Sequence, residues 1–311
     1  MRRSLSMQKR YARTRAIVHH LRTDEVNQMI RSQSRRQSPV CNRVRGWAGV
    51  LVILTLGLMP HLATPVLAQA MVDSLDLSSD EFTKADMTRG DIETALAKLK
   101  DGETLDLSGK RLNGLDLSGM DLTRTRLQAA RLNNAILKDV KFDGVVLDAA
   151  WALKSDFTGA SFVSASLFQT QMMDCRLDGA NFSNAMVGAD MTRASLTKAK
   201  FDNAMLAPDL TNQSMGLMRG VLNSAKLDGA SFKGANLTRA TLQYASLRGA
   251  DFEGANLTGS ELGGADLTGA NVAGANFDHA DIDSAKLLGL KGKDRAKGLD
   301  TAVNLNKAFV D

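Results

Sequence analysis

The sequence is poor in the side chains on which catalysis, metal binding and disulfide cross-linking depend. Its 311 residues include two cysteines, four histidines and four prolines, and aromatic residues make up 5%. After Ala70 only Cys175 and His279 remain of the first two kinds, so that part of the chain can form no internal disulfide or Cys/His zinc site. We expect Cys175 to be a small buried side chain and His279 to be solvated. Phosphate-binding glycine loops, nucleophile elbows and HExxH motifs are also missing. The sequence therefore predicts a protein without enzymatic activity or cofactor.

Positive charge is confined to the beginning of the chain. Residues 1–46 contain 12 Lys and Arg against two acidic residues, and residues 47–70 contain no Asp, Glu, Lys or Arg. Residues 71–311 contain 27 basic and 32 acidic residues. Because this main part is mildly acidic, no nucleic-acid partner is expected for it.

The start of the chain has the three parts of a secretory signal peptide. A basic flank precedes the apolar run WAGVLVILTLGLM, and the tripeptide Ala68-Gln69-Ala70 has the small-x-small pattern of a cleavage site before Met71. We therefore expect a periplasmic or secreted bacterial protein. The alternative is a membrane anchor, Trp47 to Leu67, but that span reaches the required ~20 residues only by including Pro60, His61 and Pro65.

A five-residue repeat dominates the rest of the chain. In GADFEGANLTGSELGGADLTGAN, residues 249–271, a small residue, a polar residue and a large apolar residue recur every five positions. In a helix or a continuous strand, side chains five positions apart would not lie on one face. They do lie on one face if the chain makes a short extended step and then turns. Four such steps close a square coil, and the coils stack by parallel strand-like pairing.

The large apolar residue of each unit is called the central residue. Central residues run in steps of five from Leu107 to Val187, continue after a step of four from Met191 to Leu206, and resume from Leu222 to Leu287. Twelve of the last 14 have alanine two positions earlier, which indicates an inward position with room only for a small side chain. Phe142, Phe162 and Phe182 follow one another at intervals of four units, and Phe232 and Phe252 repeat this spacing, as we interpret it, on another side. With Phe201, these residues form the predicted core ladder.

These units resemble the pentapeptide repeat family, whose consensus is A-[D/N]-L-x-x. The matching units include Ala235-Asn236-Leu237, Ala250-Asp251-Phe252 and Ala265-Asp266-Leu267. The resemblance implies an all-β fold, a right-handed quadrilateral parallel β-helix over residues 105–290. It also implies an alternative function, because some family members imitate DNA and bind type II topoisomerases in the cytosol. The interspersed basic residues here argue against a DNA-like field.

Two features interrupt the repeat and are candidate interaction sites. Residues 207–220, which include Pro208 and Met215, break the pattern and predict a bulge or loop, either a partner contact or a tolerated insertion. We expect this longer step to offset the four-residue step in register. Trp151 is either an exposed anchor for a partner or a local packing residue.

Caps are expected at both ends of the stack. Thr88 and Asp91 have capping-box spacing and predict a helix near residues 89–100, after a short extended segment. Leu299, Val303, Leu305 and Phe309 are expected to close the other end through short helical turns. The predicted regions are a basic leader 1–46, a signal region 47–70, an N-terminal cap 71–104, the repeats 105–290 and a C-terminal cap 291–311.

The function predicted from these observations is that of an exported scaffold that binds a protein partner. The identity of the partner is open, a homodimer is possible, and membrane contact is expected only through an uncleaved leader. No residue is assigned a catalytic, cofactor or metal role.

Overall fold

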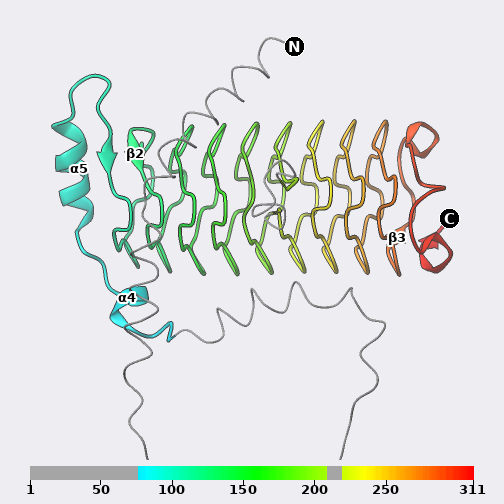
Figure 1. Ribbon diagram of the computed structural model, residues 1–311, viewed down its shortest axis with the longest axis horizontal. Helices are drawn as coiled ribbons and strands as arrows, with labels where there is room; N and C mark the ends of the chain where they lie inside the picture. Colours follow the sequence, from blue (N-terminus) through cyan, green and yellow to red (C-terminus); the bar gives the residue numbers. More distant parts are fainter. Residues whose placement is uncertain (1–75, 209–218) are drawn as a thin grey trace, which may run out of the picture. The chain divides into compact units, whose positions relative to one another are not determined.

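The computed structural model describes residues 76–208 and 219–311 (Figure 1). Residues Ala68–Asp311 belong to one compact unit, and its apolar core runs from Ile92 to Leu287. The predicted leader and signal region, residues 1–70, and most of the predicted 207–220 loop lie outside the described residues.

Residues 105–287 form a stack of four-sided coils. Each side contributes one parallel bridge to the same side of the next coil, as in Asp116↔Ile136 and Ile136↔Asp156. Only the longest pairings form strands, with β1 (Leu105–Asp106) paired to β2 (Thr125–Arg126) and β3 (Lys286–Leu287) paired to β4 (Phe309–Val310). Every central residue from Leu107 to Leu287 is at most 1% exposed. The predicted four-sided β-helix is therefore confirmed as the architecture of the repeats.

The corners explain why glycine recurs in the repeat. Two positions after most central residues the backbone has a positive φ, for example 71° at Gly144 and 59° at Asn184. Glycine adopts this conformation without steric cost and is the commonest residue there, although residues as large as Tyr244 also occupy it. The alanine two positions before the central residue points inward, and Ala160 and Ala180 are fully buried.

The six phenylalanines of the predicted ladder form one continuous stack. Neighbouring ring centroids are 4.8–5.0 Å apart, with interplanar angles of 2–11°. The interpretation that Phe232 and Phe252 lie on another side is wrong. The ring of Phe201 lies between those of Phe182 and Phe232, and all six residues belong to the same side.

Both irregular steps in the repeat lie at the same corner, between the side of Val187 and Leu206 and the side of Met191 and Leu222. The pairing interval across the four-residue step is shorter by one position, as in Gln171↔Asp190, and the interval across the long step is longer by eleven, as in Asp190↔Val221. The expected offset is confirmed in the five-residue register, because one missing residue and eleven additional ones make a net gain of ten, which is two whole units. Each change is absorbed at the corner, and the sides stay in register.

The N-terminal segment packs on the first coil. Helix α5 (Arg89–Ala97) begins with the predicted capping box between Thr88 and Asp91 and ends three residues before the predicted limit. Its Ile92 is fully buried in the core. The preceding segment, expected to be extended, contains the short helix α4 (Asp80–Thr83). Ala85 then forms an antiparallel bridge with Leu112 of the first coil.

The C-terminal segment continues the stack with a longer period. Lys291, Lys297, Val303 and Phe309 pair with four successive sides of the preceding coil, so each side has six residues instead of five. The 3-10 helices η1 (Lys293–Arg295) and η2 (Leu305–Lys307) occupy two corners. Ala296, Ala302 and Ala308 pack against the core, as does Leu299. The expectation that Val303, Leu305 and Phe309 close the stack is wrong, because this period turns alanines inward and leaves those three residues exposed.

Candidate functional site

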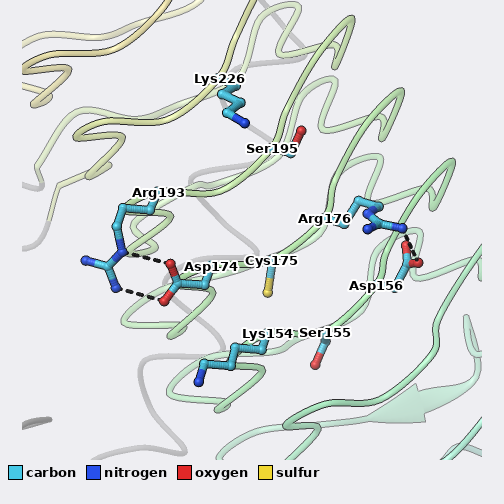
Figure 2. A pocket seen from close by; sticks show the side chains of 9 residues that line it. All are labelled: Lys154, Ser155, Asp156, Asp174, Cys175, Arg176, Arg193, Ser195 and Lys226. Atoms are coloured by element: carbon cyan, nitrogen blue, oxygen red, sulfur yellow. Dashed lines mark hydrogen bonds and ion pairs between the residues drawn. The ribbon is translucent and has the colours of Figure 1, made fainter.

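A depression of about 310 Å³ lies at the corner that follows the side of Ala152, Met172 and Met191 (Figure 2). Charged side chains surround its opening. Arg193 forms a two-pronged ion pair with Asp174, at 2.7 and 2.8 Å, and Arg176 lies 3.5 Å from Asp156. The residues that line it are Lys154, Ser155, Asp156, Asp174, Cys175, Arg176, Arg193, Ser195 and Lys226.

Two groups of this depression that could act as nucleophiles are engaged with the backbone. Cys175 is buried, as predicted, and its Sγ donates a hydrogen bond to the carbonyl oxygen of Ala152 at 2.7 Å. Burial raises the pKa of the Cys175 thiol to about 12, so the thiol is protonated at neutral pH. The Ser155 hydroxyl donates to the carbonyl oxygen of Leu132 at 2.5 Å. Both side chains are therefore bonded to carbonyl oxygens, which do not activate a nucleophile as a carboxylate or an imidazole does.

The described residues do not support a metal site or a chemical role for histidine. No group of three or more His, Cys, Asp and Glu side chains is placed to hold a metal ion in residues 76–208 and 219–311. His279 is highly exposed and lies at a corner position with a φ of 54°. Its Nε2 is 3.9 Å from Oδ1 of Asp278.

Asp148 is a carboxylate in a largely buried environment. Its Oδ1 accepts hydrogen bonds from the Ser166 hydroxyl at 2.6 Å and from the Phe168 amide at 3.0 Å, both in the next coil. Burial raises the pKa of Asp148 despite these two bonds. In contrast, hydrogen bonds from the side chain and amide of Thr123 lower the pKa of the more exposed Asp121.

We expect Asp148→Asn to stabilise the protein more at pH 7 than at pH 4. The raised pKa means that the folded state binds more protons than the unfolded state above the ordinary pKa of 3.8, so the wild-type side chain stabilises less as the pH rises through that window. Asparagine keeps an acceptor for Ser166 and Phe168 and carries no charge. Urea unfolding at both pH values measures the effect. Asp121→Asn is the matched control with the opposite sign, and equal pH dependence of the two variants would contradict the interpretation.

Trp151 packs against the N-terminal segment. Its ring meets that of Phe82 edge to face, with centroids 5.5 Å apart, and Trp151 is half-buried. The Arg131 guanidinium lies 5.3 Å from the centroid of the same Phe82 ring and also pairs with Glu81. Of the two interpretations of Trp151, the contacts support local packing.

Only the two ends of the predicted 207–220 loop lie in the described residues. Pro208 is buried, and the Gly220 amide donates to the Leu206 carbonyl oxygen at 2.8 Å, which closes the base. Arg219 donates to the carbonyl oxygen of Arg239 and pairs with Glu261 at 2.8 Å. Met215 lies outside the described residues. Pro208 and Trp151 do not form one site, because the side of Trp151 resumes after the loop at Val221, three coils beyond Trp151.

The predicted signal-cleavage residues Ala68, Ala70 and Met71 also lie outside the described residues, as does the alternative anchor, Trp47 to Leu67. Within residues 76–208 and 219–311, no helix is both long enough and apolar enough to cross a membrane.

Sequence reasoning missed the residues that form the C-terminal end of the stack. The signal was present in the spacing of six between Ala296, Ala302 and Ala308, which repeats the inward small position with a longer step. A period of five does not connect these alanines, so the five-residue pattern does not predict that they continue the repeat.

Comparison with known proteins places the repeats in a described family. The model of pentapeptide repeats matches eight copies, over residues 106–139, 171–207, 221–259 and 260–291. None of the curated proteins matches the chain significantly.

Solved structures of pentapeptide repeat proteins are also similar. HetL from the cyanobacterium Nostoc, which is involved in regulating heterocyst differentiation, shares 26% identity over 72% of this chain and 94% of HetL, with a TM-score of 0.40. A trypsin-treated variant of QnrB1, a plasmid-mediated fluoroquinolone resistance protein, shares 21% identity over 64% of this chain and 91% of its own, with a TM-score of 0.46. At these TM-scores the likeness says nothing about what this chain binds.

The assignment therefore depends on the eight repeat copies and on the regular register of the stacked sides. These two observations show that the chain belongs to the pentapeptide repeat family.

Proposed function

We propose that this protein is an exported, non-enzymatic scaffold whose stack of coils presents rigid sides to a protein partner. The observation that carries the proposal is the continuous pairing of the sides, from Arg111↔Arg131 to Asp281↔Val303. Pairing on every side fixes the outward side chains on a regular surface, and solenoids use such extended surfaces for binding. In the depression, the Cys175 thiol and the Ser155 hydroxyl donate to backbone carbonyl oxygens, which favours a binding role.

The finer features of the fold belong to the same proposal. We take the stack to be right-handed, as in the family that it resembles. We also take α5 and the six-residue-period coil to be caps that cover the core. Support for the first cap comes from Ile92, which is fully buried, and from Met87 and Leu96, which pack against the core.

Export is supported by the leader pattern. N-terminal sequencing of the protein recovered from fractionated cells tests it directly. We expect Met71 as the first residue, in a periplasmic or extracellular fraction. A chain that retains residues 1–70 in the cytosol would remove the export part of the proposal, and retention in the membrane fraction would favour the anchor, Trp47 to Leu67. Replacing Ala68 and Ala70 by bulky residues is the control, because it should block cleavage without changing the repeats.

A further inference from the structure

Exposed apolar side chains are concentrated at the C-terminal end of the stack. The end coil is defined as residues 288–311, drawn in orange to red in Figure 1. In the described residues nine large hydrophobic side chains are exposed, and five of them belong to this coil, with Phe309 57% exposed. The five are Leu288, Val303, Leu305, Phe309 and Val310.

Strand β4 has one edge to which none of the described residues pairs. Phe309 and Val310 pair with Lys286 and Leu287 through the other edge. Val310 occupies a position equivalent to a central residue, yet it is 50% exposed because no described residue covers it. The end coil therefore covers the preceding coil of the core but leaves its own Phe309 and Val310 exposed.

The other half of the end coil is basic. Lys291, Lys293, Arg295 and Lys297 are exposed, and Asp294 is the only acidic residue within residues 288–298. The side chains of Lys291, Arg295 and Lys297 have no ion pair with any described residue. The preceding residues 251–283 contain seven acidic residues and no Lys or Arg. Charge thus changes sign sharply at the end coil.

We propose that the end coil binds the surface of an anionic lipid bilayer, so that the stack contacts the membrane through this end. Exposed Phe, Leu and Val side chains beside Lys and Arg are the combination that binds the interface between headgroups and acyl chains. Each Lys or Arg near such a surface contributes through attraction to anionic headgroups, and this attraction falls off within a Debye length, ~8–10 Å. Of the seven acidic residues in 251–283, five are paired with Lys or Arg side chains, so the adjoining sides offer little unpaired positive charge to anionic headgroups. The unpaired basic residues of the end coil therefore favour contact through the end.

Charge argues against a second copy of the chain as the occupant. In a twofold end-to-end dimer, the same surface meets itself, so the basic residues of both end coils approach one another. Like charges across a contact weaken it. A free phosphate is also a poorer match, because it would use the basic residues and leave Phe309 and Val310 without a role.

The inference goes beyond the proposed scaffold role and does not depend on it. Membrane contact through the end coil leaves the sides of the preceding coils accessible to a partner. It also differs from the sequence expectation, which limited membrane contact to the leader. The site of leader cleavage tests export, whereas vesicle binding tests the end coil, so either idea can fail while the other holds.

Co-sedimentation with vesicles tests the proposal. Residues 71–311 are the form to use, because the basic leader would itself bind anionic lipid and the apolar core lies within Ala68–Asp311. We expect binding to vesicles of phosphatidylglycerol and phosphatidylcholine in equal amounts, weaker binding at high salt, and none to phosphatidylcholine alone. Absence of binding to the anionic vesicles at low salt would overturn the proposal.

Variants locate the contact. Replacing Lys291, Arg295 and Lys297 together by glutamine should weaken vesicle binding about a hundredfold. The matched control replaces Lys98, Lys141 and Lys200 by glutamine, which changes the net charge equally but away from the end coil, and should retain binding. Equal losses in both triple variants would show a general charge effect and would overturn the proposal. Circular dichroism checks that both variants are folded.

A probe at position 309 separates the lipid surface from the other occupants. In Phe309→Trp the new indole should shift its emission to the blue when anionic vesicles are added, and inorganic phosphate at equal ionic strength should produce no shift. A shift with phosphate alone would overturn the proposal. Size-exclusion chromatography with light scattering tests whether the end coil binds a second copy of the chain. A dimer that Phe309→Ser dissociates, together with no vesicle binding, would assign the end coil to that second copy and overturn the proposal.

Discussion

Replacing Phe182 by alanine is expected to lower the free energy of unfolding by about 3–5 kcal/mol. The Phe182 ring is fully buried between those of Phe162 and Phe201, with both centroid distances at 4.8 Å. The neighbouring rings are held at the spacing of the coils and cannot move into the space that the ring leaves. The cavity therefore persists, and the lost burial and the cavity both destabilise the fold. Denaturant unfolding followed by circular dichroism measures the change.

A second substitution at Phe182 separates the contribution of burial from that of ring stacking. The rings are nearly parallel at the repeat distance of the coils, and leucine occupies the central position of many other units. We therefore expect Phe182→Leu, which retains most of the volume, to cost less than about 1.5 kcal/mol. Phe309→Ala is the exposed control and should change stability little. A Phe182→Leu variant as unstable as Phe182→Ala would show that the rings contribute more than their volume.

The second large effect is expected at Asn113, which links the N-terminal segment to the stack. Its amide nitrogen donates to the carbonyl oxygens of Glu81 and Lys84, at 3.1 and 3.0 Å. Its Oδ1 accepts from the backbone amide and the side chain of Asn133, at 3.0 and 3.1 Å. Asn113 is 4% exposed, so water cannot easily replace these partners.

Asn113→Ala should therefore destabilise the protein by about 3 kcal/mol, because each buried group left without a partner costs about 1–3 kcal/mol. The loss should be local at first, with faster hydrogen exchange in α4 and α5 than in the middle coils. Asn223 occupies the equivalent corner position in a later coil, where its Oδ1 accepts one bond, from the Gln243 amide at 3.0 Å. Asn223→Ala is the control, and we expect about 1 kcal/mol. Uniform exchange throughout Asn113→Ala would contradict a local role for this residue.

The architecture could be predicted because the five-residue period specifies which side chains point inward. Central residues are recognised by size, and the small residue two positions earlier is recognised by the space that it must leave. The period says nothing of which side a residue occupies after an irregular step. Counting in steps of five therefore places Phe232 on the wrong side, because it cannot show that eleven extra residues are accommodated at a single corner.

The ends and the surface were less predictable for a related reason. The end coil has six residues per side, and its inward alanines gave no large apolar signal. The α4 segment is a single helical turn, and its place depends on contacts with Asn113 and Arg131 that are distant in sequence. Trp151 stands out in the sequence, but its partner Phe82 lies in the segment before the repeats and could not be deduced from local pattern.

The corner between Val187 and Met191, and between Leu206 and Leu222, has a practical consequence. It has accepted the loss of one residue in one coil and the gain of eleven in the next, while the phenylalanine rings on either side remain in line. The number of residues at this corner can therefore change without disturbing the packing of the core. We expect foreign peptides grafted between Pro208 and Arg219 to leave the core unchanged.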